Sequence, residues 1–129
     1  MPTQTKLTAA DRRHFEKLLG VQRHDLESAL GRIVITLGDV IEARNSGSDD
    51  EHDPEGPNLT MEWSRISGVH SDLAAKSASI DQALARIRDG SYGFCTRRGE
   101  PIGRERLEAR PAAELCIECA RELEAERRA

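Results

Sequence analysis

Apolar residues recur at intervals of three and four along two long stretches of the chain, with polar residues between them. Such spacing aligns the apolar side chains in one narrow stripe of an α-helix, as in a coiled-coil seam. The first stretch predicts a helix over 8–44, with Thr8 and Asp11 forming a capping box at its start. Gln22 interrupts its seam, whose apolar members are Phe15, Leu19, Leu26, Leu30, Ile33, Leu37 and Val40.

The second stretch predicts a helix over 59–89 that stops at Gly90, since glycine commonly terminates helices. Ser77 occupies one seam position, and either Val69 or His70 occupies another. The remaining seam residues are Trp63, Ile66, Leu73, Ile80, Leu84 and Ile87. Two such helices separated by a single break fold back on each other, so we expect a mainly α protein with an antiparallel coiled-coil hairpin over 8–89, preceded by a tail over 1–7.

The break between the helices reads "NSGSDDEHDPEGPN" and predicts a loop over 45–58, because its prolines and glycines disfavour regular structure. An acidic segment of this kind is usually a solvated loop. Here it lies at the end of a hairpin whose helices, at about 30 residues each, extend roughly 45 Å. We therefore expect a projecting acidic tip, formed by Asp49, Asp50, Glu51, Asp53 and Glu55.

Composition narrows the classes of partner. The chain has 129 residues, of which 33% are charged and only 3% aromatic, so long solvated helices are favoured over a large core. The net charge of −4 and the lack of a basic run argue against direct DNA binding. No apolar run approaches the roughly 18 residues of a membrane span, and the N-terminus lacks a signal-peptide pattern. We expect a cytoplasmic protein with reduced cysteines and no membrane partner.

The cysteines lie in the last segment, 90–129. Cys116 and Cys119 form a CxxC pair, whereas Cys95 is followed three residues later by Arg98. CxxC turns present two sulfurs to one zinc ion, and two such turns make a four-thiolate site. The segment therefore predicts a zinc-finger-like module, with a short two-stranded ribbon between Cys95 and Leu107 and a terminal helix that begins at Pro111.

The sequence segments "YGFC" and "RRGEPIGRERLEARPAAELCIEC" resemble the C-terminal finger of the DksA/TraR family of RNA-polymerase regulators. The layout of hairpin, acidic tip, finger and terminal helix is similar as well. The resemblance implies a non-enzymatic transcription regulator that enters the secondary channel of RNA polymerase and acts near the catalytic centre through its tip. It further implies action in the stringent response, together with ppGpp at the polymerase interface, without direct DNA contact.

The resemblance assigns roles to a few positions. Family tips carry the arrangement D-x-x-D-x-A, and Asp53 matches its first aspartate. The second aspartate position is Gly56, so Glu55 is the nearest substitute carboxylate. Arg110 matches a basic residue that contacts ppGpp in responsive members, whereas Ala120 and Ser79 replace two lysines.

The state of the finger stays open from the sequence. Arg98 cannot bind zinc, because a guanidinium remains protonated and offers only hydrogen-bond donors. In one alternative, zinc is held by three thiolates and by water or an outside ligand. In the other, the finger contains no metal, and Arg98 pairs with Glu100, Glu114 or Glu118. A disulfide between the CxxC thiols is a third state. The candidate metal ligands are Cys95, Cys116 and Cys119.

Three other functions compete with a monomeric polymerase regulator. A coiled-coil adaptor with a different protein partner fits the polar seam residues Gln22 and Ser77. An enzyme built on an open three-cysteine zinc site lacks a general base beside the thiols. A transcript-cleavage factor of the Gre type shares the channel and the acidic tip, but the finger sequence favours the DksA-like assignment.

Overall fold

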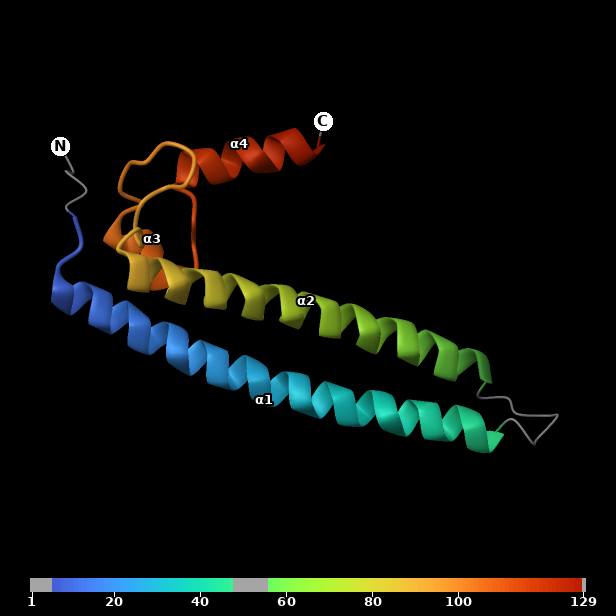
Figure 1. Cartoon of the computed structure of the whole chain (residues 1–129). Helices are drawn as coiled ribbons and strands as arrows, with labels where there is room; N and C mark the ends of the chain where they lie inside the picture. Colours follow the sequence, from blue (N-terminus) through green and yellow to red (C-terminus); the bar gives the residue numbers. More distant parts are fainter. Residues whose placement is uncertain (1–5, 48–55, 129) are drawn as a thin grey trace. The chain divides into compact units, whose positions relative to one another are not determined.

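The computed structural model describes residues 6–47 and 56–128, with side chains over 6–45 and 59–128. It confirms a mainly helical fold (Figure 1). Two long helices form a hairpin and a small C-terminal module follows, and the described residues contain no extended strand. The helices are α1 (Ala9–Gly47), α2 (Gly56–Asp89), α3 (Arg104–Ala109) and α4 (Ile117–Arg128). The chain divides into two compact units, Met1–Arg23 with Ser79–Ala129 and His24–Ala78.

The predicted capping box starts α1. The backbone N–H of Thr8 donates to Asp11 Oδ2 at 3.0 Å, and the backbone N–H of Asp11 donates to Thr8 Oγ1 at 3.0 Å. The bond from the Thr8 backbone lowers the pKa of Asp11, and the guanidinium of Arg104, 2.8 Å away, acts in the same direction. Two free N–H groups at the helix start are thereby satisfied, and the start of α1 is tied to α3.

The helices reach further into the predicted loop than the sequence indicates. α1 continues to Gly47 and α2 begins at Gly56, so both extend into the stretch 45–58. The predicted stop after Asp89 is confirmed, because Gly90 has a φ of +86° and the N–H groups of Ser91 and Tyr92 donate to the Arg86 carbonyl at 3.0 and 3.1 Å. No described helix is apolar over a length sufficient to cross a membrane.

The unit His24–Ala78 contains the C-terminal part of α1 beside the N-terminal part of α2 (Figure 1). Among the side chains that the structure describes in this unit, Val40 and Ile66 are the buried ones, at 7% and 2% exposure. Val69 is 38% exposed whereas His70 is half-buried, so His70 is the seam residue at that step. The other seam positions are half-buried: Leu26, Leu30, Ile33, Leu37, Trp63, Leu73 and Ser77. This part of the hairpin thus has a thin seam.

The other unit has a denser core. The ring of Phe15 on α1 lies 5.9 Å from the ring of Tyr92, which follows α2. Arg23 and Asp81 form an ion pair at 3.2 Å between the two helices. The buried members of this core come from both long helices and from the module: Phe15, Leu19, Ile80, Ala83, Tyr92, Cys95, Ile102, Leu107 and Cys119. The small module is therefore packed on the helices and is not an isolated finger.

Two predictions for the module were wrong. The expected ribbon between Cys95 and Leu107 is reduced to one antiparallel bridge, between Phe94 and Pro101, and the residues after it form α3. The terminal helix begins at Ile117, not at Pro111. The physical reason is that the carbonyls before Cys116 accept hydrogen bonds from other segments, which holds that stretch out of a helix.

Candidate functional site

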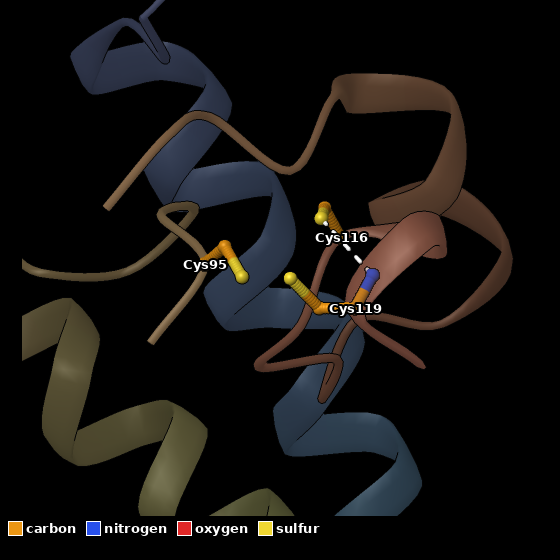
Figure 2. Close-up of side chains that lie close together, drawn as sticks. All are labelled: Cys95, Cys116 and Cys119. Carbon is orange, nitrogen blue, oxygen red and sulfur yellow. Dashed lines mark hydrogen bonds between the residues drawn. The ribbon is translucent and has the colours of Figure 1, made fainter. Parts of the chain in front are cut away.

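The three cysteines come together at one point of the module. Their sulfur atoms all lie within 4.8 Å of one another, as Figure 2 shows. Cys95 and Cys119 are only 2% and 1% exposed, and Cys116 is half-buried. The three cysteines that the sequence offers as candidate metal ligands therefore lie together.

A tight turn positions Cys95. Its N–H donates to the Glu100 carbonyl at 2.7 Å, and its carbonyl accepts from the N–H of Gly99 at 2.7 Å. Gly99 has a φ of +73°, a conformation that favours glycine. Burial raises the pKa of the Cys95 thiol, but backbone N–H groups, chiefly those of Cys116 and Arg98, outweigh it and bring the pKa to about 7.

Cys116 serves as the N-cap of α4. Its sulfur accepts the N–H of Cys119 at 3.5 Å, and its carbonyl accepts the N–H of Ala120 at 2.9 Å (Figure 2). The bond to the sulfur satisfies one orphan donor of the first helical turn, the role that a hydroxyl or carboxylate usually has, and the bond to the carbonyl is the first regular bond of the helix. They also direct Cys119 toward Cys95. Burial, together with hydrogen bonds to the neighbouring thiols, raises the pKa of Cys119 to about 12.

Arg98 lies where a four-cysteine finger has its fourth thiol. Its Nη1 is 2.7 Å from Glu118 Oε2, and its Nη2 is 2.8 Å from Glu122 Oε1. The bond to Glu118 raises the pKa of the guanidinium further, so this side chain stays cationic. Of the partners expected from the sequence, Glu118 is confirmed. Glu100 and Glu114 instead contribute backbone carbonyls, which accept from the N–H groups of Cys95 and Thr96 at 2.7 and 2.9 Å.

The residues at the cluster do not complete a four-ligand zinc site. Three thiols match three corners of a tetrahedral site. Among the described residues, no fourth histidine, cysteine or carboxylate joins the cluster, and the guanidinium of Arg98 has no lone pair to offer. A metal ion bound here would be held by Cys95, Cys116 and Cys119. It would connect the turn that carries Cys95 to α4, and its fourth coordination position would be left to water or an outside ligand.

The other predicted site residues lie elsewhere. The acidic tip residues, Asp49, Asp50, Glu51, Asp53 and Glu55, lie outside the described residues. Arg110 is exposed at the C-terminal end of α3, where its N–H donates to the Arg106 carbonyl at 2.7 Å. The structure therefore does not bring Arg110 into the thiol cluster.

Comparison with known proteins bears directly on this architecture. Residues 90–125 match the family described as the prokaryotic dksA/traR C4-type zinc finger. A relative from Salmonella typhimurium, named RNA polymerase-binding transcription factor DksA, is 30% identical over 118 residues, which are 92% of this chain and 74% of the relative. The chain belongs to the DksA/TraR family. A DksA of Escherichia coli K12 matches with the same identity and coverage.

Two further matches in the DksA/TraR family differ in extent. A DksA of Caulobacter vibrioides is 61% identical over only 41 residues, so the match spans 32% of this chain and 29% of that relative. The solved structure of transcription factor DksA2 from Pseudomonas aeruginosa matches with a TM-score of 0.79 and 28% identity. It covers 94% of this chain and 88% of that chain. The family fold thus extends over nearly the whole chain, whatever the state of the finger.

Sequence reasoning missed some of the side chains that surround the cluster. Arg97 pairs with Glu126 at 3.1 Å and lies 3.8 Å from Glu122. Glu118, Glu122 and Glu126 follow one another at intervals of four, a spacing that places them on one face of a helix. The sequence signal was this glutamate spacing together with the two adjacent arginines, Arg97 and Arg98, which could pair with such a face.

Proposed function

We propose that this chain is a transcription regulator that binds RNA polymerase. The observation that carries the proposal is the match along 92% of the chain to a protein named RNA polymerase-binding transcription factor DksA. The helical hairpin with a packed C-terminal module, shared with the DksA2 structure, supports it. The relatives are named as transcription factors, and the proposed activity is accordingly regulatory rather than enzymatic.

The proposed route of action is the secondary channel of the polymerase. α1 and α2 have 39 and 34 residues, and the segment joining them carries the five acidic residues. Helices of that length provide a stiff arm, and carboxylates at its end would act near the catalytic centre, where cationic groups and metal ions handle phosphates. Asp53 and Glu55 are the acting pair in this proposal, with Asp49, Asp50 and Glu51 adding negative charge.

Other features of the proposal follow from charge and position. The chain carries a net charge of −4, which suits contact with a basic protein channel better than contact with DNA. Binding as a monomer in the cytoplasm fits insertion of one hairpin per polymerase. Arg110 is exposed and available to ppGpp at the polymerase interface, whereas Ala120 and Ser79 offer no cation. We therefore expect little added effect of ppGpp on transcription by this regulator.

Reconstituted transcription from a responsive promoter tests the role of the tip. The double variant D53N/E55Q removes two negative charges, and we expect it to lose the effect on transcription while its binding to polymerase changes little. A matched control, E16Q/E42Q, removes the same number of charges from exposed positions on α1. We expect this control to behave like the unaltered chain.

Two results would contradict the tip mechanism. An effect on transcription that survives in D53N/E55Q would show that these carboxylates are not needed. Equal loss in D53N/E55Q and E16Q/E42Q would show that only overall charge matters. Cleavage of RNA in backtracked complexes would instead assign the chain to transcript cleavage of the Gre type.

One observation favours the adaptor function as a second candidate. Three apolar side chains on α1 within the unit His24–Ala78 face outward, since Val34, Ile35 and Ile41 are 57%, 67% and 44% exposed. Val34 and Ile41, seven positions apart, share one face of the helix, and exposed apolar side chains that gather on one face are typical of a protein-contact surface. The adaptor function becomes the better account if the purified chain fails to bind polymerase.

A further inference from the structure

The stretch before Cys116 is fixed by hydrogen bonds that involve no sulfur. The buried hydroxyl of Tyr92 donates to the Pro111 carbonyl at 2.7 Å, and Arg106 Nε donates to the Leu115 carbonyl at 2.9 Å. Between them, the Glu114 carbonyl accepts the N–H of Thr96 at 2.9 Å. Carbonyls on both sides of this loop thus have donors from outside it, and the loop that delivers the CxxC pair has a fixed position without a metal.

Ion pairs fasten α4 to the turn that carries Cys95. Arg98 bonds Glu118 and Glu122 at 2.7 and 2.8 Å, and Arg97 bonds Glu126 at 3.1 Å. The two arginines are adjacent in the turn, and the glutamates lie on one face of α4. A metal ion bound by Cys95 and by the CxxC pair would join the same turn to α4. The ion pairs therefore connect the same two segments as that ion would, and they start from position 98, where the fourth ligand is missing.

Two of the three thiols are packed like small apolar side chains. Cys95 and Cys119 are 2% and 1% exposed, and they belong to a core that includes Tyr92, Ile102 and Leu107. A free cysteine in such a setting behaves as a small hydrophobic residue. Burial of the thiols therefore contributes to the folded state without coordination.

We infer that this finger is held closed without structural zinc, by the pairing of Arg97 and Arg98 with the glutamates of α4. The arginine at position 98 is then a positioning residue that replaces the fourth ligand. The thiol cluster remains as part of the core, and the module folds as one body with the adjoining ends of α1 and α2. Treatment with a metal chelator should therefore leave the stability of the module unchanged.

Position 98 allows a direct test with the untagged full-length chain. The unaltered chain, R98C and R98Q are each produced with zinc present, washed with EDTA, analysed for metal and unfolded by heat with and without EDTA. R98C supplies the missing thiol. We expect R98C to retain stoichiometric zinc and to lose thermal stability in EDTA, because a ligand bound only by the native state stabilises it. The unaltered chain should retain no stoichiometric zinc and should show the same Tm in both conditions.

R98Q removes the positive charge and shortens the side chain, and so removes the ion pairs to Glu118 and Glu122. We expect a lower Tm than that of the unaltered chain, equally with and without EDTA. Stoichiometric zinc in the washed, unaltered chain, with a Tm that falls in EDTA, would overturn the inference. A Tm of R98Q equal to that of the unaltered chain would also overturn it, as would R98C that gains no zinc. If R98C fails to fold, the other two proteins still decide the outcome.

Discussion

The two units of the chain hold α1 and α2 together in different ways. In the unit that contains the finger, Phe15 packs against Tyr92, and residues from the module fill the space beside both helices. In the unit His24–Ala78, Val40 and Ile66 are the buried side chains among those described, and the rest of the seam is half-exposed. The stability of the finger unit therefore comes from packing between the module and the two helices. The stability of the unit His24–Ala78 comes from the contacts between its helices.

That difference is consistent with the proposed function. In that proposal, one unit supplies the packed module, and the unit His24–Ala78 contains the helix ends that lead to the acidic segment. The unit His24–Ala78 has few buried side chains, and Gly31 and Gly38 in it have no neighbour within 4 Å of an added Cβ. Sites that carry function often lie in the less stable part of a fold.

The largest expected contrast compares one leucine in each unit. Leu107 is fully buried in the finger unit, and Leu30 is half-buried in the seam of His24–Ala78. We expect Leu107→Ala to lower the free energy of unfolding by about 2–5 kcal/mol, since it leaves a cavity in a packed core. Leu30→Ala should cost about 1 kcal/mol, because less apolar surface leaves water there. Denaturant titration followed by circular dichroism measures both, and equal costs would contradict the contrast.

Two glycines give an effect of opposite sign. Gly93 has a φ of +92°, and an added Cβ would meet Leu7 Cδ1 at 2.7 Å. Gly38, inside α1, has open space around it. We expect Gly93→Ala to cost about 1–3 kcal/mol through backbone strain. Gly38→Ala should instead gain about 0.5–1 kcal/mol, because alanine is the better helix former. Thermal unfolding of both variants checks the signs, and a destabilised Gly38→Ala would show a contact that the open surface does not suggest.

The smallest expected contrast is between Thr8, which caps the start of α1, and Thr36, which lies within α1. The Oγ1 of Thr8 accepts the N–H of Asp11 at 3.0 Å, whereas the hydroxyl of Thr36 donates to the Arg32 carbonyl at 3.0 Å in the middle of the helix. We expect Thr8→Ala to lower stability by about 0.5–2 kcal/mol through loss of the cap. Thr36→Ala should be neutral or slightly stabilising, since a mid-helix hydroxyl competes for a backbone carbonyl. A larger loss at Thr36 would refute this assignment, again by thermal unfolding.

The long helices were predictable because their signals are local and repeated. The seam spacing, the Thr8-Asp11 box and the Gly90 stop each act through neighbouring residues, and the structure has all of them. The cysteine cluster was predictable as well, since CxxC spacing restricts where the sulfurs lie. The loop ends were less well predicted, because helix ends depend on a few residues with weak preferences.

The rest of the module depends on contacts between distant residues. Pro111 is a good first residue of a helix, yet its carbonyl accepts from Tyr92, 19 positions earlier, and α4 begins only at Ile117. Arg98 reaches Glu122 over 24 positions. A local pattern contains no such information, so the start of α4 and the helix α3 were not predictable from it, and the glutamate spacing indicated a shared helix face without identifying its partner.

Binding of the purified full-length chain to core RNA polymerase, with a Gre-type factor as competitor, tests the central claim most directly. We expect saturable binding that the competitor displaces, because both proteins would occupy the secondary channel. E16Q/E42Q and D53N/E55Q should bind similarly, which separates docking from the action of the tip. No binding at micromolar concentrations, or binding that the competitor leaves untouched, would contradict the channel mechanism.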